Sequence, residues 1–163
     1  MAKAGLRVIV ATDPAQLETV APDVFDYPVE RALCAAFLAD QRHHLALAMD
    51  GETVVGLCSG TRVAHPDKPD QLFINELGVT LAYRRRGLAR ELVRKLLEVA
   101  RSHGCSEAWV LADSDNAPAQ AVYAGAGGSP SSGGVMFSFA LGGPGELATP
   151  PESGEAAPGE GEA

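Results

Sequence analysis

The sequence predicts a mixed α/β fold, with a central, mostly antiparallel sheet and helices on its faces. Three observations carry this prediction. Apolar residues recur at helical spacing over residues 88–103, where Leu88, Leu92 and Leu96 form one stripe. The pair Asp50-Gly51 separates two apolar runs, as in a β-hairpin. Strand and helix patterns then alternate along the second half of the chain.

The first half is expected to supply one strand, two helices and the hairpin. An apolar run at residues 6–11 predicts the strand. Asp13 followed by Pro14 predicts a helix start, because it places a capping side chain before a proline in the first turn. A second helix is expected from Pro28, where the apolar spacing becomes helical. The hairpin strands are expected at residues 44–49 and 53–63.

The second half is expected to continue with a strand at residues 72–80 and the helix at 88–103. Gly104 is placed to end that helix. The remaining expected elements are a strand at 108–112, a short helix at 118–126 and a final strand at 135–141.

The chain of 163 residues is long enough for one folded domain, which we expect at residues 1–141. Residues 142–163 consist mainly of Gly, Pro, Glu, Ala and Ser and contain no aromatic residue. Such a segment buries too little apolar surface to offset its chain entropy. We therefore expect a disordered acidic tail.

Composition excludes several classes of function. The net charge of −8 is a poor match for nucleic acid. No apolar run approaches the ~20 residues of a membrane span, and residues 1–6 do not resemble a secretory signal. The three cysteines are far apart and form no C-x-x-C pair, which disfavours a metal site and suits a reducing cytoplasm. Exposed sheet edges favour a homodimer.

Three consecutive arginines, Arg84, Arg85 and Arg86, directly precede the helix that opens at Gly87. A helix N-terminus is already positive, so cations there are unfavourable unless an anion docks between them. Gly87 lets a phosphate approach the backbone, and Ala89 keeps the next turn small. The segment matches neither a P-loop nor G-x-G-x-x-G. The alternative is a solvated, arginine-rich turn.

At these residues the chain resembles the GNAT superfamily of N-acetyltransferases. Its cofactor loop, R/Q-x-x-G-x-G/A, is matched by Arg84 to Ala89, including Leu88. The strand before it, Leu77-Gly78-Val79, is similar to the splayed, bulged strand whose backbone pairs with pantetheine in that family. The resemblance thus implies a sheet with splayed central strands and acetyl-CoA as the acetyl donor.

A second motif follows the next strand. The family pattern N-x-x-A-x-x-x-Y is found as Asn116, Ala119 and Tyr123, followed by Gly125, Gly127 and Gly128. The resemblance implies that Asn116 and Ala119 lie at the cofactor. It also implies that Tyr123 is the general acid that protonates the departing thiolate. The alternative for Tyr123 is an aromatic side chain that packs on the sheet.

The chain also resembles, more loosely, the aminoglycoside 3-N-acetyltransferases. The residues that carry this likeness include Val24-Phe25-Asp26, the strand at residues 73–79 and the run from Ala112 to Asp115. The acceptor implied is a small cationic amine, and drug acetylation with antibiotic resistance is one form of that activity.

Glu76 is the best candidate for the base that takes the amine proton, because it lies on the strand that enters the cofactor loop. Burial near the cofactor would raise its pKa. Asp26, Asp113 and Asp115 are expected to form an acidic wall for a cationic acceptor. For Asp115, a helix cap is the simple alternative. Cys58 lies in an apolar strand and Cys105 follows the residue that ends a helix, so neither is expected to carry an acetyl group, and we expect direct transfer in a ternary complex.

Two other functions stay open at this point. The same enzyme class could act on another amine, such as a small metabolite, an amino acid, or a protein lysine or N-terminus. A non-catalytic acyl-CoA-binding module is the other alternative, and the presence of both Glu76 and Tyr123 speaks against it.

Overall fold

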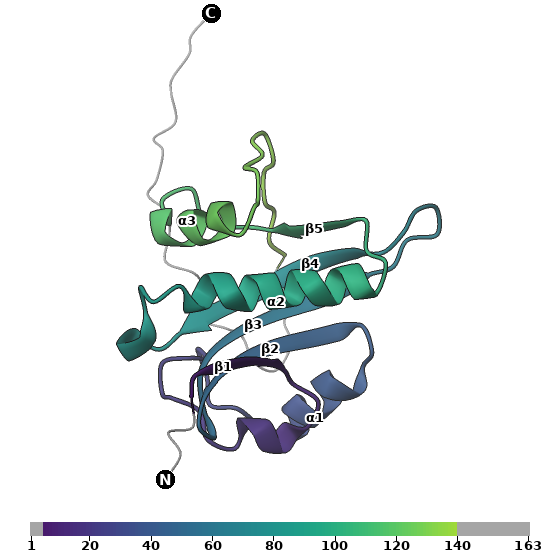
Figure 1. The fold of residues 1–163 in the computed structure, drawn as a ribbon. Helices are drawn as coiled ribbons and strands as arrows, with labels where there is room; N and C mark the ends of the chain where they lie inside the picture. The colour runs from purple at the N-terminus through teal and green to yellow at the C-terminus, as the bar shows by residue number, and fades with distance from the viewer. Residues whose placement is uncertain (1–4, 140–163) are drawn as a thin grey trace, which may run out of the picture. The chain divides into compact units, whose positions relative to one another are not determined.

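The computed structural model describes residues 5–139 and divides between Pro130 and Ser131 (Figure 1). Every regular element of the described residues lies in the first part. These elements are β1 (Arg7–Val10), η1 (Pro14–Leu17), α1 (Arg31–Ala39), β2 (His43–Asp50), β3 (Thr53–Val63), β4 (Gln71–Val79), η2 (Leu81–Tyr83), α2 (Leu88–Ser102), β5 (Glu107–Val110) and α3 (Ala117–Gly125).

The strand expected at residues 135–141 is not found in the described part of that range. Residues 131–139 contain neither helix nor strand. No described backbone hydrogen bond involves residues 135–139, and an alternation of apolar side chains does not make a strand without a ladder partner. Residues 140 and 141, and the tail expected at 142–163, lie outside the described residues.

The five strands form one sheet in the order β1-β2-β3-β4-β5. The first four pair antiparallel, and β5 joins β4 in parallel. The expected mixed, mostly antiparallel sheet is therefore confirmed. The hairpin between β2 and β3 turns at Gly51, whose φ of 61° is the left-handed conformation that glycine adopts without strain.

The parallel pair β4–β5 holds together over only part of β4. Gln71–Ile74 pairs with Glu107–Val110, and the rings of Phe73 and Trp109 stack there with centroids 4.5 Å apart. Beyond Ile74, β4 continues for five residues with no strand on its β5 side among the described residues. The two strands therefore separate after Ile74, as the splayed sheet requires.

A β-bulge lies at the point of separation. Ser59 pairs with Glu76 and Gly60 pairs with Ile74, so Asn75 is the extra residue on β4. We expected the bulge within residues 77–79, but it lies one residue before Glu76, at Asn75.

Hydrophobic cores cover both faces of the sheet. On one face, Leu88, Leu92 and Leu96 of α2 belong to one core with side chains of the strands, among them Ala46, Ala48, Leu72 and Ile74. On the other face, the alternate residues Leu45, Leu47 and Leu57 pack with η1, α1 and the segment between them. Strand alternation thus sends neighbouring residues of β2 into two separate cores.

Two expected helices of the first half are shorter than predicted. The cap at Asp13 is present, with its carboxylate accepting from Ala15 N–H, but only a single 3-10 turn follows it. The second helix begins at Arg31 rather than at Pro28, because residues 20–29 run as an irregular segment that lines a cavity. No helix among residues 5–139 is long and apolar enough to cross a membrane.

Candidate active site

The turn between β4 and α2 presents a row of unused N–H groups. Arg85 has a φ of 60° and Gly87 a φ of 80°, so the chain reverses its local hand twice before α2 begins. The N–H groups of residues 85–90 find no acceptor among the described residues, and no side chain caps the helix. A β-carbon at Gly87 would meet no atom within 4 Å. This open concavity of donors at a helix N-terminus suits an anion such as a phosphate.

The three arginines of the turn have different roles. Arg84 donates from Nε to the Val79 carbonyl oxygen at 2.8 Å and so fastens the turn to the end of β4. Arg86 lies over the Tyr83 ring, 5.2 Å from its centroid, and the Tyr83 hydroxyl donates to Asp50. The bond to Asp50 raises the pKa of Tyr83. Arg85 is exposed beside them.

Asp23 fixes the beginning of the turn from the other side. Its carboxylate accepts from the Thr80 hydroxyl through one oxygen and from Leu81 N–H, at 2.7 Å, through the other. These bonds lower the pKa of Asp23, with the Thr80 bond the largest cause. No local sequence pattern indicates this role of Asp23, because 57 residues separate it from Thr80.

A cavity of about 230 Å³ opens beside the unpaired part of β4. It brings together Glu76 and Asp26, two of the expected acceptor-side carboxylates. Glu76 is exposed, so the burial that we expected for it is absent. The other lining residues are Val24, Phe25, Leu57, Asn75, Leu77 and Gly78.

Asp113 and Asp115 line neither this cavity nor a second one, of about 370 Å³, at residues 17–29. Both are exposed in the loop between β5 and α3. Of the three aspartates expected to form an acidic wall, only Asp26 therefore lines this cavity, together with Glu76. The helix cap offered as the alternative for Asp115 is instead Asn116, whose side-chain oxygen accepts from Ala119 N–H at 3.1 Å.

Tyr123 lies half-buried on α3 and packs against the core under α2. Burial raises the pKa of its hydroxyl, and the nearby Cys58 adds to the shift. Tyr123 therefore keeps its proton at neutral pH, as a proton donor must. Burial also raises the pKa of the Cys58 thiol to about 12, which makes Cys58 a poor nucleophile.

Glu76 and Tyr123 belong to opposite faces of the sheet. Glu76 lines the cavity with Leu57 and Val24, which belong to the core on the η1 and α1 face. Tyr123 packs with the core on the α2 face. Between these two residues, the part of β4 beyond Ile74 has no paired strand on its β5 side among the described residues.

Helix α3 is held against α2 through Gly125, one of the glycines of the second motif. A β-carbon there would lie 2.8 to 2.9 Å from the guanidinium of Arg90. Arg94 donates to the Gly125 carbonyl oxygen at 3.3 Å. Glycine at this position lets two cations of α2 reach the negative C-terminal end of α3.

Ser59 is a further polar residue near the cavity that the sequence did not indicate. The Ser59 hydroxyl is buried and has no hydrogen-bond partner among the described residues. Ser59 is the cross-strand neighbour of Glu76, so its side chain lies on the same face of the sheet. A serine within an apolar strand carries no sequence signal that separates it from a core residue.

Residues 12–127 match the model of the acetyltransferase (GNAT) family. The chain therefore belongs to this family and is an acyltransferase with acetyl-CoA as its acetyl donor. No curated protein sequence matches the chain.

Solved structures share the fold at low sequence identity. One is the aminoglycoside acetyltransferase meta-AAC0020 from an uncultured soil metagenomic sample, in complex with sisomicin, with a TM-score of 0.70, 16% identity, and 83% of this chain and 96% of that chain covered. A second is AAC(6')-Iy with a bisubstrate analogue, CoA-S-monomethyl-acetylneamine, at a TM-score of 0.68, 15% identity, and 83% and 99% coverage. A third is a transcriptional regulator from Bacillus halodurans, at a TM-score of 0.66, 22% identity, and 83% and 100% coverage. None of the three is described as a 3-N-acetyltransferase.

Proposed function

We propose that this protein transfers the acetyl group of acetyl-CoA directly to a primary amine of a small cationic acceptor. The observation that carries the proposal is the pairing of two features along β4. The turn after β4 offers unused N–H groups to a pyrophosphate, and the part of β4 that is not paired with β5 supplies Glu76, Leu77 and Gly78 to the cavity.

The donor is assigned to one continuous surface. Residues 84–89 would hold the pyrophosphate through backbone N–H groups, with the free edge of Leu77, Gly78 and Val79 pairing with the pantetheine arm. Asn116 and Ala119 would lie at its other side. Because Asn116 already caps α3, its effect on the donor would come through the position of that helix as well as through any direct contact.

The two ionisable side chains supply proton transfer. Glu76 takes a proton from the acceptor amine, directly or through one water, as the nitrogen attacks the thioester carbonyl carbon. The carbon–nitrogen bond forms and the carbon–sulfur bond breaks. Tyr123 gives its proton to the departing thiolate and regains one from solvent. No cysteine carries the acetyl group in this scheme.

For the acceptor we favour an aminoglycoside or a related polyamine. Glu76 and Asp26 place two carboxylates at a cavity with no cation among its lining residues, which suits a ligand with more than one ammonium group. Two of the structural neighbours are described as aminoglycoside acetyltransferases. The 3-N position is a finer part of this proposal and rests on the sequence resemblance alone.

A different amine is favoured by the second cavity. It shares Phe25 and Asp26 with the first, and most of its other lining side chains are apolar, among them Leu17, Val20 and Val29. An amine attached to an apolar group, such as an amino acid or a peptide N-terminus, would use that surface. An aminoglycoside would not.

The test is release of free thiol from acetyl-CoA with a panel of aminoglycosides, polyamines, amino acids and peptides. We expect acceptor-dependent release with at least one class, and mass spectrometry should find one acetyl group added per thiol released. Turnover of aminoglycosides alone would favour the first acceptor class, and turnover of apolar amino acids or peptides alone would favour the second.

The matched variant for this test is Glu76→Gln, which keeps the shape of the side chain and removes the base. We expect it to bind acetyl-CoA as the parent does and to lose activity by about 10². Activity equal to the parent at every pH would remove Glu76 from the mechanism. Binding of acetyl-CoA with no turnover on any acceptor would favour the non-catalytic acyl-CoA-binding module.

A further inference from the structure

Residues 20–29 cross directly over the strand that would hold the pantetheine arm. A β-carbon on Gly78 would lie 2.4 Å from the Val24 carbonyl oxygen, so the two backbones touch at a glycine. The same segment supplies Val24, Phe25 and Asp26 to the cavity that contains Glu76. The acceptor side and the donor side of the site thus meet along one short stretch of backbone.

Asp23 adds a polar connection between these two sides. It belongs to the crossing segment, and its two carboxylate oxygens bind Thr80 at the end of β4 and Leu81 N–H at the start of the turn. Each oxygen has its own donor. An alanine at this position has no acceptor and loses both bonds, whereas an asparagine could keep both, since its oxygen accepts from Leu81 N–H and its amide can donate to the Thr80 hydroxyl.

We propose that Asp23 is a positioning residue that couples the acceptor segment, residues 20–29, to the donor turn. Through this carboxylate, CoA bound at the turn would order both the turn and the wall of the acceptor cavity. This inference rests on the proposed function, since it assumes that CoA binds at residues 84–89.

The coupling has a thermodynamic consequence that a merely structural contact lacks. If binding at the turn stabilises the acceptor segment, then acceptor binding must strengthen donor binding by the same factor. Couplings of this kind amount to about 5- to 150-fold in affinity. The segment has two amides whose opening can report on it, because Ala21 N–H bonds to Val54 and Val24 N–H bonds to Ala21.

The experiment is hydrogen exchange of the full chain with and without CoA as the probe, so that no acceptor need be known. We expect CoA to slow exchange both at residues 84–91 and at Ala21 and Val24, by at least about fivefold at the latter. In Asp23→Ala, protection at 84–91 should persist while protection at Ala21 and Val24 is lost. Thr80→Val, which removes only one of the two bonds, should give an intermediate result.

The control is Asp13→Ala. Asp13 also accepts a backbone N–H, but this bond caps η1 and none of its described bonds reaches residues 80–91. It should respond to CoA as the parent does. Protection at 84–91 without any change at Ala21 and Val24 in the parent would overturn the coupling and leave the proposed function standing. Absence of protection at both places would overturn the two together.

Discussion

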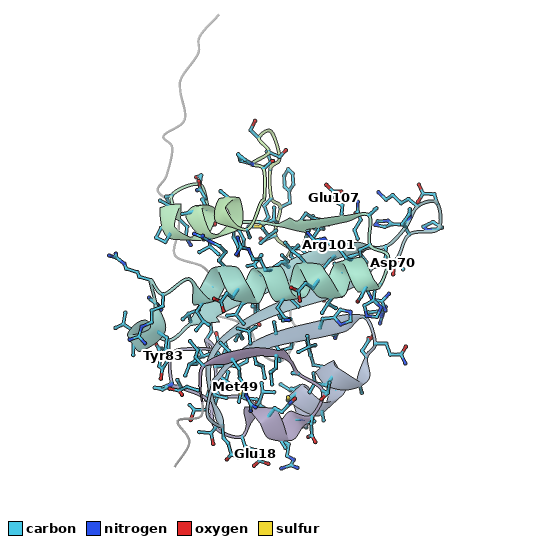
Figure 2. The ribbon with its side chains drawn as sticks, viewed as in Figure 1. Glu18, Met49, Asp70, Tyr83, Arg101 and Glu107 are labelled. Atoms are coloured by element: carbon cyan, nitrogen blue, oxygen red, sulfur yellow. The ribbon has the colours of Figure 1, made fainter. Side chains whose placement is uncertain are left out.

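The two ends of α2 differ in how the backbone groups without a partner inside the helix are satisfied. Figure 2 labels Tyr83 at one end of the helix and Asp70 and Arg101 at the other. At the Arg101 end, Gly104 takes a φ of 72°, and the N–H groups of residues 103–105 bond back to the last carbonyls of the helix. At the Tyr83 end, the first N–H groups have no acceptor among the described residues.

Side chains repeat the contrast. Near the Arg101 end, Arg62 donates to His44 at 3.2 Å, to Asp70 at 3.0 Å and to the Gln41 carbonyl at 3.0 Å. Arg85 at the other end makes no described hydrogen bond. A helix end whose polar groups bind each other is explained by folding alone. One that leaves them unused, at backbone angles that cost free energy, points to a ligand.

The largest effect should come from Gly87→Glu. The substitution puts a carboxylate where the pyrophosphate would lie and an L-residue at a φ of 80°. We expect acetyl-CoA affinity to fall by more than about 10², since the charge repels and the N–H groups acquire an internal acceptor. Calorimetric titration measures it.

Gly104→Glu is the matched control, because Gly104 has a similar φ of 72° and equally open surroundings. Both variants should lose about 1 kcal/mol of unfolding free energy from backbone strain. Only Gly87→Glu should lose affinity for acetyl-CoA. Equal affinity for acetyl-CoA in both variants would contradict the assignment of the donor site to the Gly87 end of the helix.

The next effect concerns Tyr123, whose helix packs beside the first half of α2 through Arg90 and Arg94. Tyr123→Phe should lower kcat by about 10² with little change in the KM for acetyl-CoA, because it removes a proton donor and keeps the ring. Steady-state kinetics give the two constants.

Tyr83→Phe sharpens this test. It breaks the bond to Asp50 beside the donor turn, so it should raise the KM for acetyl-CoA and leave kcat nearly as it was. If Tyr123→Phe turned over as fast as the parent, the general acid would have to be sought elsewhere.

The smallest effect lies at the Arg101 end. Burial, His103, Arg62 and His43 together lower the pKa of His44 to about 4, from 6.5. The unfolded chain therefore binds more protons than the native one between these values, and the native state should lose stability as pH falls from 6.5 through 4. The full shift corresponds to about 3 kcal/mol, and for this half-buried group we expect about 1–2 kcal/mol.

Denaturant titrations of the parent and of His44→Gln at pH 7 and pH 4.5 measure that loss. The difference between the two proteins should shrink by about 1 kcal/mol at the lower pH, because only the parent carries the titrating group. A difference that does not change with pH would mean that the paired cluster at this end does not hold His44 neutral.

Local chemistry made part of this molecule predictable from sequence. The stripe of α2, its stop at Gly104 and the hairpin at Gly51 follow from periodicity and from glycine, and the structure has them. The turn at residues 84–89 was predictable because three arginines before a helix conflict with its dipole. Each of these signals lies within a few residues of its effect.

What sequence could not supply depends on distant partners. Asp23 bonds to Thr80, 57 residues away in the sequence. The Ser59 hydroxyl is buried without a hydrogen-bond partner among the described residues because of the tertiary packing around it. Asp113 and Asp115 were expected beside Glu76 since they follow the neighbouring strand, but β5 ends early and leaves them in a separate loop. The apolar run at residues 135–139 had the right alternation for a strand and found no ladder.

The surplus residue Asn75 reaches further than its own conformation. Counted by twos from Leu72 and Ile74, which lie in the α2-side core, Glu76 would point into that core and Leu77 would point to the opposite face of the sheet. The extra residue, Asn75, exchanges the two faces for all later residues of β4. A bulge also increases the local twist of a strand. One extra residue in β4, and not the chemistry of any side chain, thus places Glu76 on the face of the sheet that carries the cavity.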